Sequence, residues 1–261
     1  LLNNDDEVTP VRLRKKLLQY VRLVNGDEPR YANPHEILMN QAYSASHGSK
    51  CLKRQVGAVL VAAAPGQMGD VVGTGFNENP PQTAPCVEEP TYGADAKKGQ
   101  RGSCYRDIVR FDILNKYAKD GWHCTLCGAR IEAIENREPP WKCARCRANL
   151  DKPFFPERAM TYCTAVHAEV AAIIAAGHRA RGTTLYTTTF PCFQCAEKIA
   201  QAGIGAIVFS EPYPDTLAGD RLTLAKIKTA RFEGVRSSRF HEIFSQVRPY
   251  YEKNQRPVVA V

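Results

Sequence analysis

The order of periodic segments in the C-terminal part is the feature that most constrains the fold of this chain. An apolar stretch with helical spacing at residues 166–176 is followed by the β-branched run TTLYTTTF, a second helical stretch at residues 192–202 and the run GAIVFS. The next segment, LTLAKIKTARFEG at residues 222–234, has a helical pattern. Helices that alternate with strands in this way are typical of an α/β fold whose sheet is partly parallel.

The N-terminal part is predicted to add a helix and a strand pair. Pro34 suits the first turn of a helix, and HEILMNQAYSASHG after it carries apolar residues at helical spacing. The runs QVGAVLVAA and DVVGTGF are predicted strands, joined by APGQMG, which has the composition of a hairpin turn. Residues 11–24 form a short amphipathic segment, whereas residues 78–160 lose periodicity. We therefore predict an arm or linker at residues 1–32, a core of residues 33–86 and 160–261, and an insertion at residues 87–159.

Composition limits the cellular setting and the kind of partner. The chain has 261 residues, 44% of them hydrophobic, and no apolar run long enough to span a bilayer, which predicts a globular protein without membrane association. A formal charge of +8 favours an acidic partner such as a nucleotide or a polynucleotide. Ten cysteines without a preceding signal-like segment favour thiolate metal ligands in a reducing cytoplasm over disulfides. Because the sequence starts at Leu1, we expect it to be part of a longer or processed protein.

Two short motifs each lie at a predicted helix start. His167 and Glu169 are two positions apart, a spacing that in a helix interior points side chains in nearly opposite directions but at the first turn lets both reach past the helix end. Cys192 and Cys195 form a C-x-x-C at the start of the next helix, a motif that suits a metal or thioredoxin-like redox chemistry. Alone, His167 and Glu169 are more often a core histidine beside a surface carboxylate. Together, the motifs supply three N/S ligands and leave a fourth position open, which indicates catalytic zinc with Glu169 as the proton carrier.

The insertion contains a second cysteine pattern. Its spacing, C-x2-C-x15-C-x2-C, is typical of a zinc ribbon, in which four thiolates close the coordination sphere and the metal is structural. A rubredoxin-like iron site is the alternative, and four free thiols are a less favoured one. The residues concerned are Cys124, Cys127, Cys143 and Cys146.

The H-x-E and P-C-x-x-C motifs resemble those of the cytidine deaminase superfamily. The resemblance implies a three-layer fold, with a mixed central sheet between helices on both faces. It also implies a mechanism in which zinc lowers the pKa of a water molecule. Glu169 would take a proton from that water, deliver it to ring N3 during attack at C4, and later protonate the departing ammonia.

Further segments narrow the resemblance to deoxycytidylate deaminases. These segments are S-K, Q-V-G-A, G-F-N-E-N-P-P, H-A-E and P-C-F-Q-C, in this order. Phe76, Glu78 and Ala171 depart from the usual pattern, which affects substrate contacts and leaves the zinc motifs intact. The substrate-binding residues that the resemblance implies, each with ordinary packing or surface charge as the alternative, are Asn77, Ser49, Lys50, Arg54 and Tyr213.

Four cysteines remain outside these motifs. Some phage-type deoxycytidylate deaminases hold an extra zinc ion partly through cysteines at the positions of Cys51 and Cys86, and this resemblance implies a third zinc site here. Buried cysteines acting as small hydrophobes are the alternative. The candidate ligands are Cys51, Cys86, Cys104 and Cys163.

The resemblances imply hydrolytic deamination of dCMP or dCTP, in a homo-oligomer. A deaminase acting on RNA or single-stranded DNA is less favoured, because few aromatic residues are interleaved with the basic ones. A binding module without turnover is less favoured because Glu169 has no structural duty at a zinc site. FEGVRSSRFHEIF, at residues 232–244, weakly resembles anti-phage deaminases that deplete deoxycytidine nucleotides, which implies a further N-terminal domain beyond this sequence.

Overall fold

The computed structural model of the chain describes residues 10–25, 27, 30–86, 104–106, 122–124, 126–131, 142–143, 145–147 and 163–245. The chain divides into two compact units, one of Leu1–Ser49, Val56–Asn77 and His167–Val261, the other of Lys50–Gln55 and Glu78–Val166. Within the described ranges, every helix is too short or too polar to cross a bilayer.

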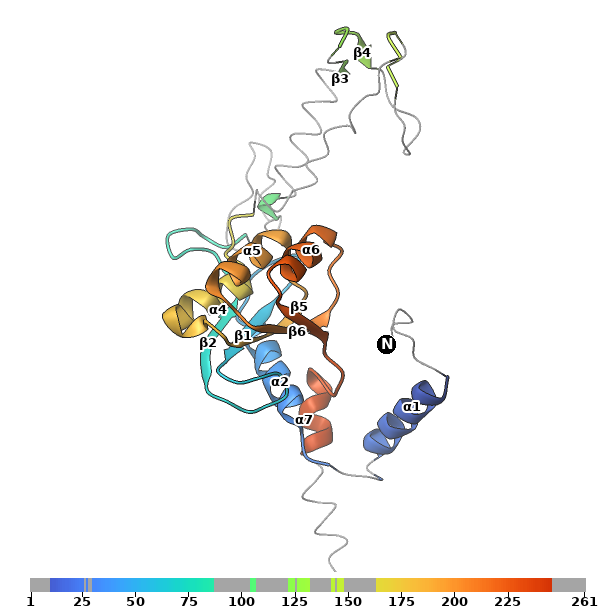
Figure 1. Ribbon diagram of the computed structural model, residues 1–261, viewed down its shortest axis with the longest axis vertical. Helices are drawn as coiled ribbons and strands as arrows, with labels where there is room; N and C mark the ends of the chain where they lie inside the picture. Colours follow the sequence, from blue (N-terminus) through green and yellow to red (C-terminus); the bar gives the residue numbers. More distant parts are fainter. Residues whose placement is uncertain are drawn as a thin grey trace, which may run out of the picture. The chain divides into compact units, whose positions relative to one another are not determined.

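The first unit contains a mixed five-stranded sheet (Figure 1). Its strand order is β2-β1-β5-β6-β7. β1 is antiparallel to both β2 and β5, whereas β5, β6 and β7 run parallel to one another. The predicted α/β fold with a partly parallel sheet is therefore confirmed. The strands are β1 (Gly57–Val61), β2 (Val71–Phe76), β5 (Thr184–Thr189), β6 (Ala206–Glu211) and β7 (Lys228–Arg231).

Helices cover both faces of this sheet, as the alternation of buried side chains requires. Leu60 of β1 and Leu185 of β5 belong to an apolar cluster with residues of α4, α5 and α6. Val59 and Tyr186, the neighbours of those leucines, point to the opposite face and pack with α2. The result is a three-layer arrangement (Figure 1). The helices of this unit are α1 (Pro10–Asn25), α2 (Pro34–Ser46), α4 (Ala168–Ala176), the 3-10 helix η2 (Gly177–Ala180), α5 (Phe193–Ala202), α6 (Thr216–Leu224) and α7 (Ser238–Phe244).

Two glycines of β2 set how closely α4 approaches the sheet. A Cβ atom on Gly75 would lie 2.4 Å from the carbonyl oxygen of Ala168, and one on Gly73 would lie 2.3 Å from that of Ala172. Both distances are far inside van der Waals contact, so only glycine lets the helix backbone pack directly against the strand. The glycines of DVVGTGF thereby place the N-terminus of α4.

The segment predicted to be helical at residues 222–234 is not one helix, and this prediction is wrong. α6 ends at Leu224, and Lys226 takes a left-handed conformation with φ of 57°. The N–H of Ile227 then donates to the carbonyl of Leu222, which closes the helix end. Residues 228–231 pair with β6 as a parallel edge strand. Backbone pairing with β6 outweighs the local helical pattern.

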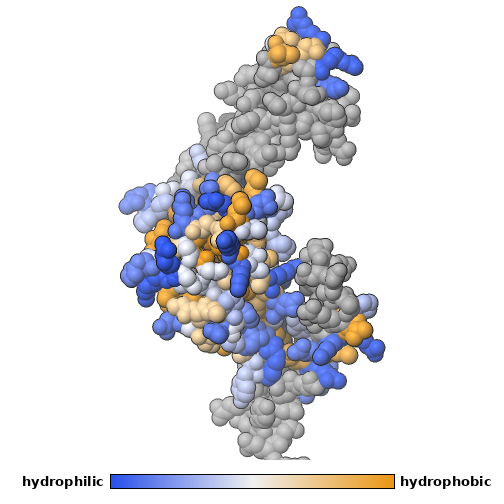
Figure 2. Space-filling model, viewed as in Figure 1, coloured by the Kyte–Doolittle hydropathy of each residue, from blue (hydrophilic) through white to orange (hydrophobic). Residues whose placement is uncertain are grey.

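The amphipathic segment predicted in the N-terminal arm forms α1. The helix carries Arg14, Lys15 and Arg22 and no acidic residue. Leu23 is buried, whereas Val11 and Val24 are exposed. Figure 2 shows apolar and hydrophilic side chains side by side on the surface of this helix.

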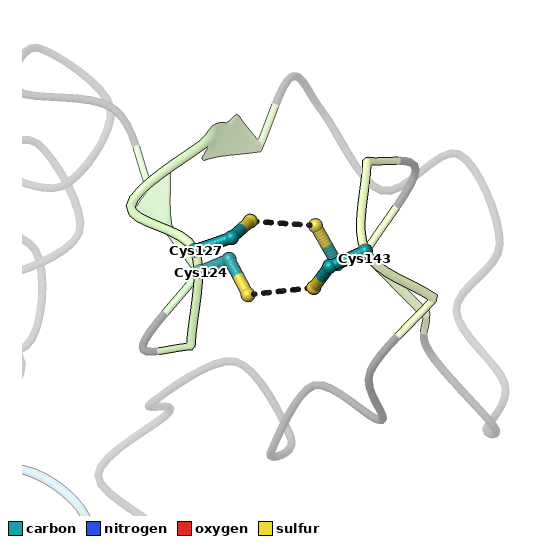
Figure 3. A group of neighbouring side chains, drawn as sticks. Cys124, Cys127 and Cys143 are labelled. Atoms are coloured by element: carbon teal, nitrogen blue, oxygen red, sulfur yellow. Dashed lines mark hydrogen bonds between the residues drawn. The ribbon is translucent and has the colours of Figure 1, made fainter.

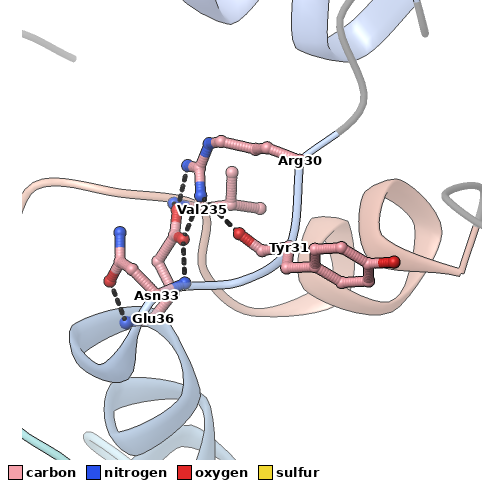
Figure 4. A network of polar contacts seen from close by, with 5 residues as sticks. All are labelled: Arg30, Tyr31, Asn33, Glu36 and Val235. Atoms are coloured by element: carbon pink, nitrogen blue, oxygen red, sulfur yellow. Dashed lines mark hydrogen bonds and ion pairs between the residues drawn. The ribbon is translucent and has the colours of Figure 1, made fainter.

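A buried carboxylate fixes the start of α2 (Figure 4). Asn33 and Glu36 form a capping box, in which each side chain accepts the backbone N–H of the other. Glu36 is fully buried and also accepts two hydrogen bonds from the Arg30 guanidinium at 2.5 Å and one from the Val235 N–H at 2.9 Å. Burial raises the pKa of Glu36, but these hydrogen bonds lower it more, so the pKa lies below its ordinary value.

The second unit contains the described part of the predicted insertion. β3 (Trp122–His123) and β4 (Arg130–Ile131) form a two-stranded antiparallel sheet. Glu78 and Val166 form an isolated antiparallel bridge. Most of residues 87–159 lie outside the described residues, and the predicted insertion boundaries stay a prediction.

Candidate metal centre and active site

The first part of the site is the N-terminus of α4. His167 is the N-cap residue, with an extended backbone (φ −72°, ψ 153°) and no capping hydrogen bond from its side chain. Its ring therefore projects beyond the helix end. Glu169 lies in the first turn and is 4% exposed. In residues 163–166, the described segment directly before this helix, Val166 forms an isolated bridge with Glu78 and there is no regular strand.

The second part is the junction between β5 and α5. Cys192 is the N-cap residue of α5, also with an extended backbone (φ −74°, ψ 169°). Cys195 follows in the first turn, and both cysteines are buried. β5 is the central strand of the sheet and pairs with β1 on one side and β6 on the other. These two ladders fix the end of β5 from which the junction starts.

The two helix starts bring together one nitrogen and two sulfur ligand atoms. The Nδ1 atom of His167 lies 3.2 Å from the Sγ atom of Cys195 and 3.4 Å from that of Cys192. The ligand atoms of all three residues lie within 4.8 Å of one another. Zinc with tetrahedral bonds of about 2.0 Å to nitrogen and 2.3 Å to sulfur places these atoms about 3.6 Å apart. The three side chains therefore fit a zinc ion and leave its fourth position to another ligand.

The ionisable groups of the site influence one another strongly. The hydrogen bond from the Cys195 thiol is the largest effect on Cys192, and together with the contacts of His167 and the N–H of Cys195 it lowers the pKa of Cys192 to about 4 against the effect of burial. The same hydrogen bond and burial raise the pKa of Cys195. Burial raises the pKa of Glu169, whose Oε2 atom accepts the Cys195 thiol at 3.4 Å. The site thus places a cysteine with a lowered pKa, Cys192, close to a carboxyl group with a raised pKa, Glu169.

A residue that the sequence analysis did not identify supports the cysteine-bearing helix. Asp215 is the N-cap residue of α6, and its Oδ1 atom accepts the N–H of Ala218 at 3.2 Å. Its Oδ2 atom accepts the N–H of Phe193, the residue after Cys192, at 2.9 Å. Asp215 therefore caps two helices at once. Only its place before a helical segment could have pointed to it in the sequence.

A known protein family matches the part of the chain that contains His167, Cys192 and Cys195. The sequence profile described as "Cytidine and deoxycytidylate deaminase zinc-binding region" matches residues 32–211, more than half of the chain. The chain belongs to this deaminase family. Its fold class and family are thus those expected from the sequence.

Two relatives that match more than two thirds of this chain share less than a third of their residues with it over the matched regions. A deoxycytidylate deaminase of Enterobacteria phage T4 is 28% identical over 182 residues, which cover 68% of this chain and 78% of the phage protein. A deoxycytidylate deaminase of Schizosaccharomyces pombe is 27% identical over 215 residues, which cover 82% of this chain and 47% of the yeast protein. The crystal structure of a dCMP deaminase from the cyanophage S-TIM5 aligns with a TM-score of 0.42 at 16% identity, covering 77% of this chain and all of that one.

The predicted substrate residues of the deaminase occupy different environments. Asn77 is buried, and its Oδ1 atom accepts the N–H of Val56 at 2.7 Å. Ser49 is also buried and donates to the carbonyl of Asn77 at 2.8 Å, so both stabilise the ends of β1 and β2. Tyr213 is half-buried against the apolar cluster that contains Cys192 and Cys195, and Lys50 and Arg54 are exposed. Their roles toward substrate stay predictions.

The four cysteines of the predicted ribbon also gather. Their sulfur atoms all lie within 4.8 Å of one another, and Figure 3 shows them converging from two turns. The backbone N–H of Cys146 leads the effects that lower the pKa of Cys143 to about 6, and the N–H groups of Cys127 and Leu126 lower that of Cys124.

The remaining four cysteines do not form a comparable group. Among the described residues, two clusters have ligand atoms close enough for a metal ion, and neither contains the cysteines predicted to hold a third zinc. The third site therefore stays a prediction without geometric support. The residues concerned are Cys51, Cys86, Cys104 and Cys163, all half-buried.

Proposed function

We propose that this chain deaminates a deoxycytidine nucleotide, dCMP or dCTP, to the corresponding deoxyuridine nucleotide, with consumption of one water and release of one ammonia. His167, Cys192 and Cys195 hold a zinc ion, which when bound lowers the pKa of a water molecule. The observation that carries the proposal is the convergence of these three ligand atoms beside a buried carboxyl group. Family membership and the deoxycytidylate deaminase relatives support the substrate class.

Glu169 performs the proton transfers in this proposal. Its carboxylate takes a proton from the attacking water and delivers it to N3 of the cytosine ring while the C4–O bond forms. The second water proton passes through the same carboxylate to the amino group, and the C4–N bond breaks as ammonia leaves. Burial at the first turn of α4 limits the access of bulk water and raises the pKa of Glu169, which makes its carboxylate a better proton acceptor than an exposed one.

Replacement of Glu169 by Gln tests this role. Glu169→Gln keeps the side-chain volume and all three metal ligands, so zinc content should stay at the wild-type level. Turnover of dCMP should fall by at least about a hundredfold, because the amide cannot carry the proton. Metal analysis and ammonia release on the same sample measure both effects.

Glu197→Gln on α5 is the matched control. Glu197 lies two positions after Cys195 and thus points to nearly the opposite side of the helix. Its replacement should leave turnover unchanged. Wild-type turnover in Glu169→Gln would contradict the assigned role.

The substrate is identified by assaying one preparation against cytidine, dCMP, dCTP, CTP and a cytosine-containing DNA oligonucleotide. The proposal expects turnover of dCMP, dCTP or both, and their relative kcat/KM values then give the preferred number of phosphates. Turnover of the oligonucleotide alone would replace the proposal by a polynucleotide deaminase. Absence of turnover with full zinc occupancy would favour a binding module.

The proposed biological role is depletion of deoxycytidine nucleotides during phage infection, by a cytoplasmic homo-oligomer. The resemblance of residues 232–244 to anti-phage deaminases supports this role. Cells that express the wild-type protein should yield fewer plaques than cells that express Glu169→Gln. Light scattering on the purified chain measures the number of subunits in the oligomer.

A further inference from the structure

The cysteine pairs of the second unit build the same local structure twice. The carbonyl oxygen of Cys124 accepts the N–H of Gly128 at 2.8 Å, and that of Cys143 accepts the N–H of Arg147 at 2.9 Å. Gly128 and Arg147, each directly after the second cysteine of its pair, have left-handed backbones with φ of 67° and 60°. Two C-x-x-C turns of one geometry therefore face each other (Figure 3).

Backbone N–H groups point at the first sulfur of each turn. The Cys124 sulfur receives the N–H groups of Leu126 and Cys127. The equivalent groups in the second turn, from Arg145 and Cys146, point at the Cys143 sulfur. Such donors stabilise negative charge on sulfur and hold the ligand in one orientation.

The distances between the turns fit a metal ion. The Sγ atoms of Cys124 and Cys146 are 3.6 Å apart, as are those of Cys127 and Cys143. This separation exceeds a disulfide bond of about 2.05 Å. It is close to the edge of about 3.8 Å that zinc–sulfur bonds of about 2.3 Å give in a tetrahedron.

We propose that Cys124, Cys127, Cys143 and Cys146 hold a zinc ion separate from that of the catalytic site, with all four coordination positions filled by the chain. Four thiolates leave no position for water or substrate, so this ion is structural. Among the described residues, the apolar clusters belong to the first unit, and the second has a sheet of two-residue strands. A metal ion would supply cohesion that packing does not supply in the described part of this unit.

Metal content of the 261-residue chain tests the proposal. Cys127→Ser should lower the zinc content by one ion per chain relative to wild type, and Cys192→Ser should do the same at the other site. After cobalt substitution, Cys192→Ser should retain the intense charge-transfer bands of a tetrathiolate site, and Cys127→Ser the weaker spectrum of a mixed nitrogen and sulfur site. Unchanged zinc content in Cys127→Ser, or iron in this site of the wild type, would overturn the proposal. Zinc content and the cobalt spectrum do not depend on deamination. Failure of the proposed function would therefore be distinguishable from failure of this metal-site proposal.

A variant that preserves all four ligands covers the case in which Cys127→Ser does not fold. A Cβ atom on Gly128 would meet nothing within 4 Å, so Gly128→Ala disturbs only the left-handed backbone. We expect about fivefold weaker zinc retention in competition with a chelator, because alanine disfavours this conformation. Arg147→Gly, at the equivalent position of the second turn, should not weaken retention. Equal retention in Gly128→Ala and wild type, or weaker retention in Arg147→Gly, would overturn the proposed two-turn site.

Discussion

Asp215 connects the first turns of two helices, and one of them carries both cysteine ligands of the candidate active site. Its Oδ2 atom accepts a hydrogen bond from the N–H of Phe193, while the N–H of Cys195 points at the Cys192 sulfur. The N–H groups of Phe193 and Cys195 thus have separate acceptors. The carboxylate of Asp215 is therefore a positioning group for the Cys192–Cys195 turn, at one remove from the ligand atoms.

Asp215→Ser separates the two functions of this side chain. Serine is a good N-cap, so α6 should stay capped and stability should change by about 1 kcal/mol or less. Its hydroxyl is too short to reach Phe193 as well, and zinc affinity at the catalytic site should fall by about tenfold. Competition with a chelator measures the affinity, and Asp220→Ser, an exposed position on α6, is the control. Unchanged zinc affinity in Asp215→Ser would show that the Phe193 contact does not position the ligands.

The lowered pKa of Glu36 makes the stability of the fold depend on pH. Its pKa in the folded state lies below the ordinary 4.5, so the ionised form stabilises the fold above that value. This contribution is lost as the pH falls through the folded-state pKa. Glu36→Gln should be about 1–3 kcal/mol less stable than wild type at pH 7, because an amide cannot accept all the N–H groups that Glu36 accepts.

Denaturant unfolding at pH 7 and at pH 3 to 5 measures this difference. The gap between wild type and Glu36→Gln should narrow as the pH falls below 4.5. Glu242→Gln, which breaks an exposed ion pair with Arg239, should alter stability little at any pH. A gap that is independent of pH would contradict the low pKa of Glu36.

Two helices of the first unit begin at positions that local sequence signals mark. Pro34 and the Asn33 cap mark the start of α2, and the C-x-x-C motif marks the start of α5. β7 was predicted wrongly because its place depends on pairing with β6, which no local pattern of Lys228–Arg231 encodes. Asp215 was missed for the same reason, since its partner Phe193 lies 22 positions away. The approach of Glu169 to Cys195 was expected because two motifs together resemble one family, and neither motif alone indicates it.

The contact between α4 and β2 gives a prediction at the scale of elements. Gly75→Ala places a methyl group 2.4 Å from backbone atoms of α4, so the helix must move away from the strand. Stability should fall by about 1–3 kcal/mol, and turnover should fall too, because His167 and Glu169 move with the helix. Thermal unfolding and kcat measure the two effects.

Gly219→Ala is the matched control for this substitution. Gly219 lies inside α6, and a Cβ atom there would meet nothing within 4 Å. The same chemical change should therefore stabilise the protein by about 0.5–1 kcal/mol, through the higher helix propensity of alanine. If Gly75→Ala left stability and turnover unchanged, the close packing of α4 on β2 would not position the site.

At the scale of the whole molecule, the two compact units draw on different sources of stability. The described apolar clusters lie on the two faces of the five-stranded sheet in the first unit, and the cysteines of the candidate active site belong to one of them. In the second unit, the four cysteines around one point are the most prominent described feature. Removal of metal should therefore affect the two units to different extents.

Hydrogen exchange with and without a strong chelator tests this difference. Amides of β1, β5 and β6 should keep their protection after metal removal, because neither the strand ladder nor the apolar cluster on the α2 face contains a candidate metal ligand. Amides of the two cysteine turns, including Gly128 and Arg147, should exchange at least about tenfold faster, since the sulfur atoms no longer share a metal ion. Loss of protection throughout the sheet at the same chelator concentration would show that the core depends on metal. Unchanged exchange at both turns would show that they are held by packing alone.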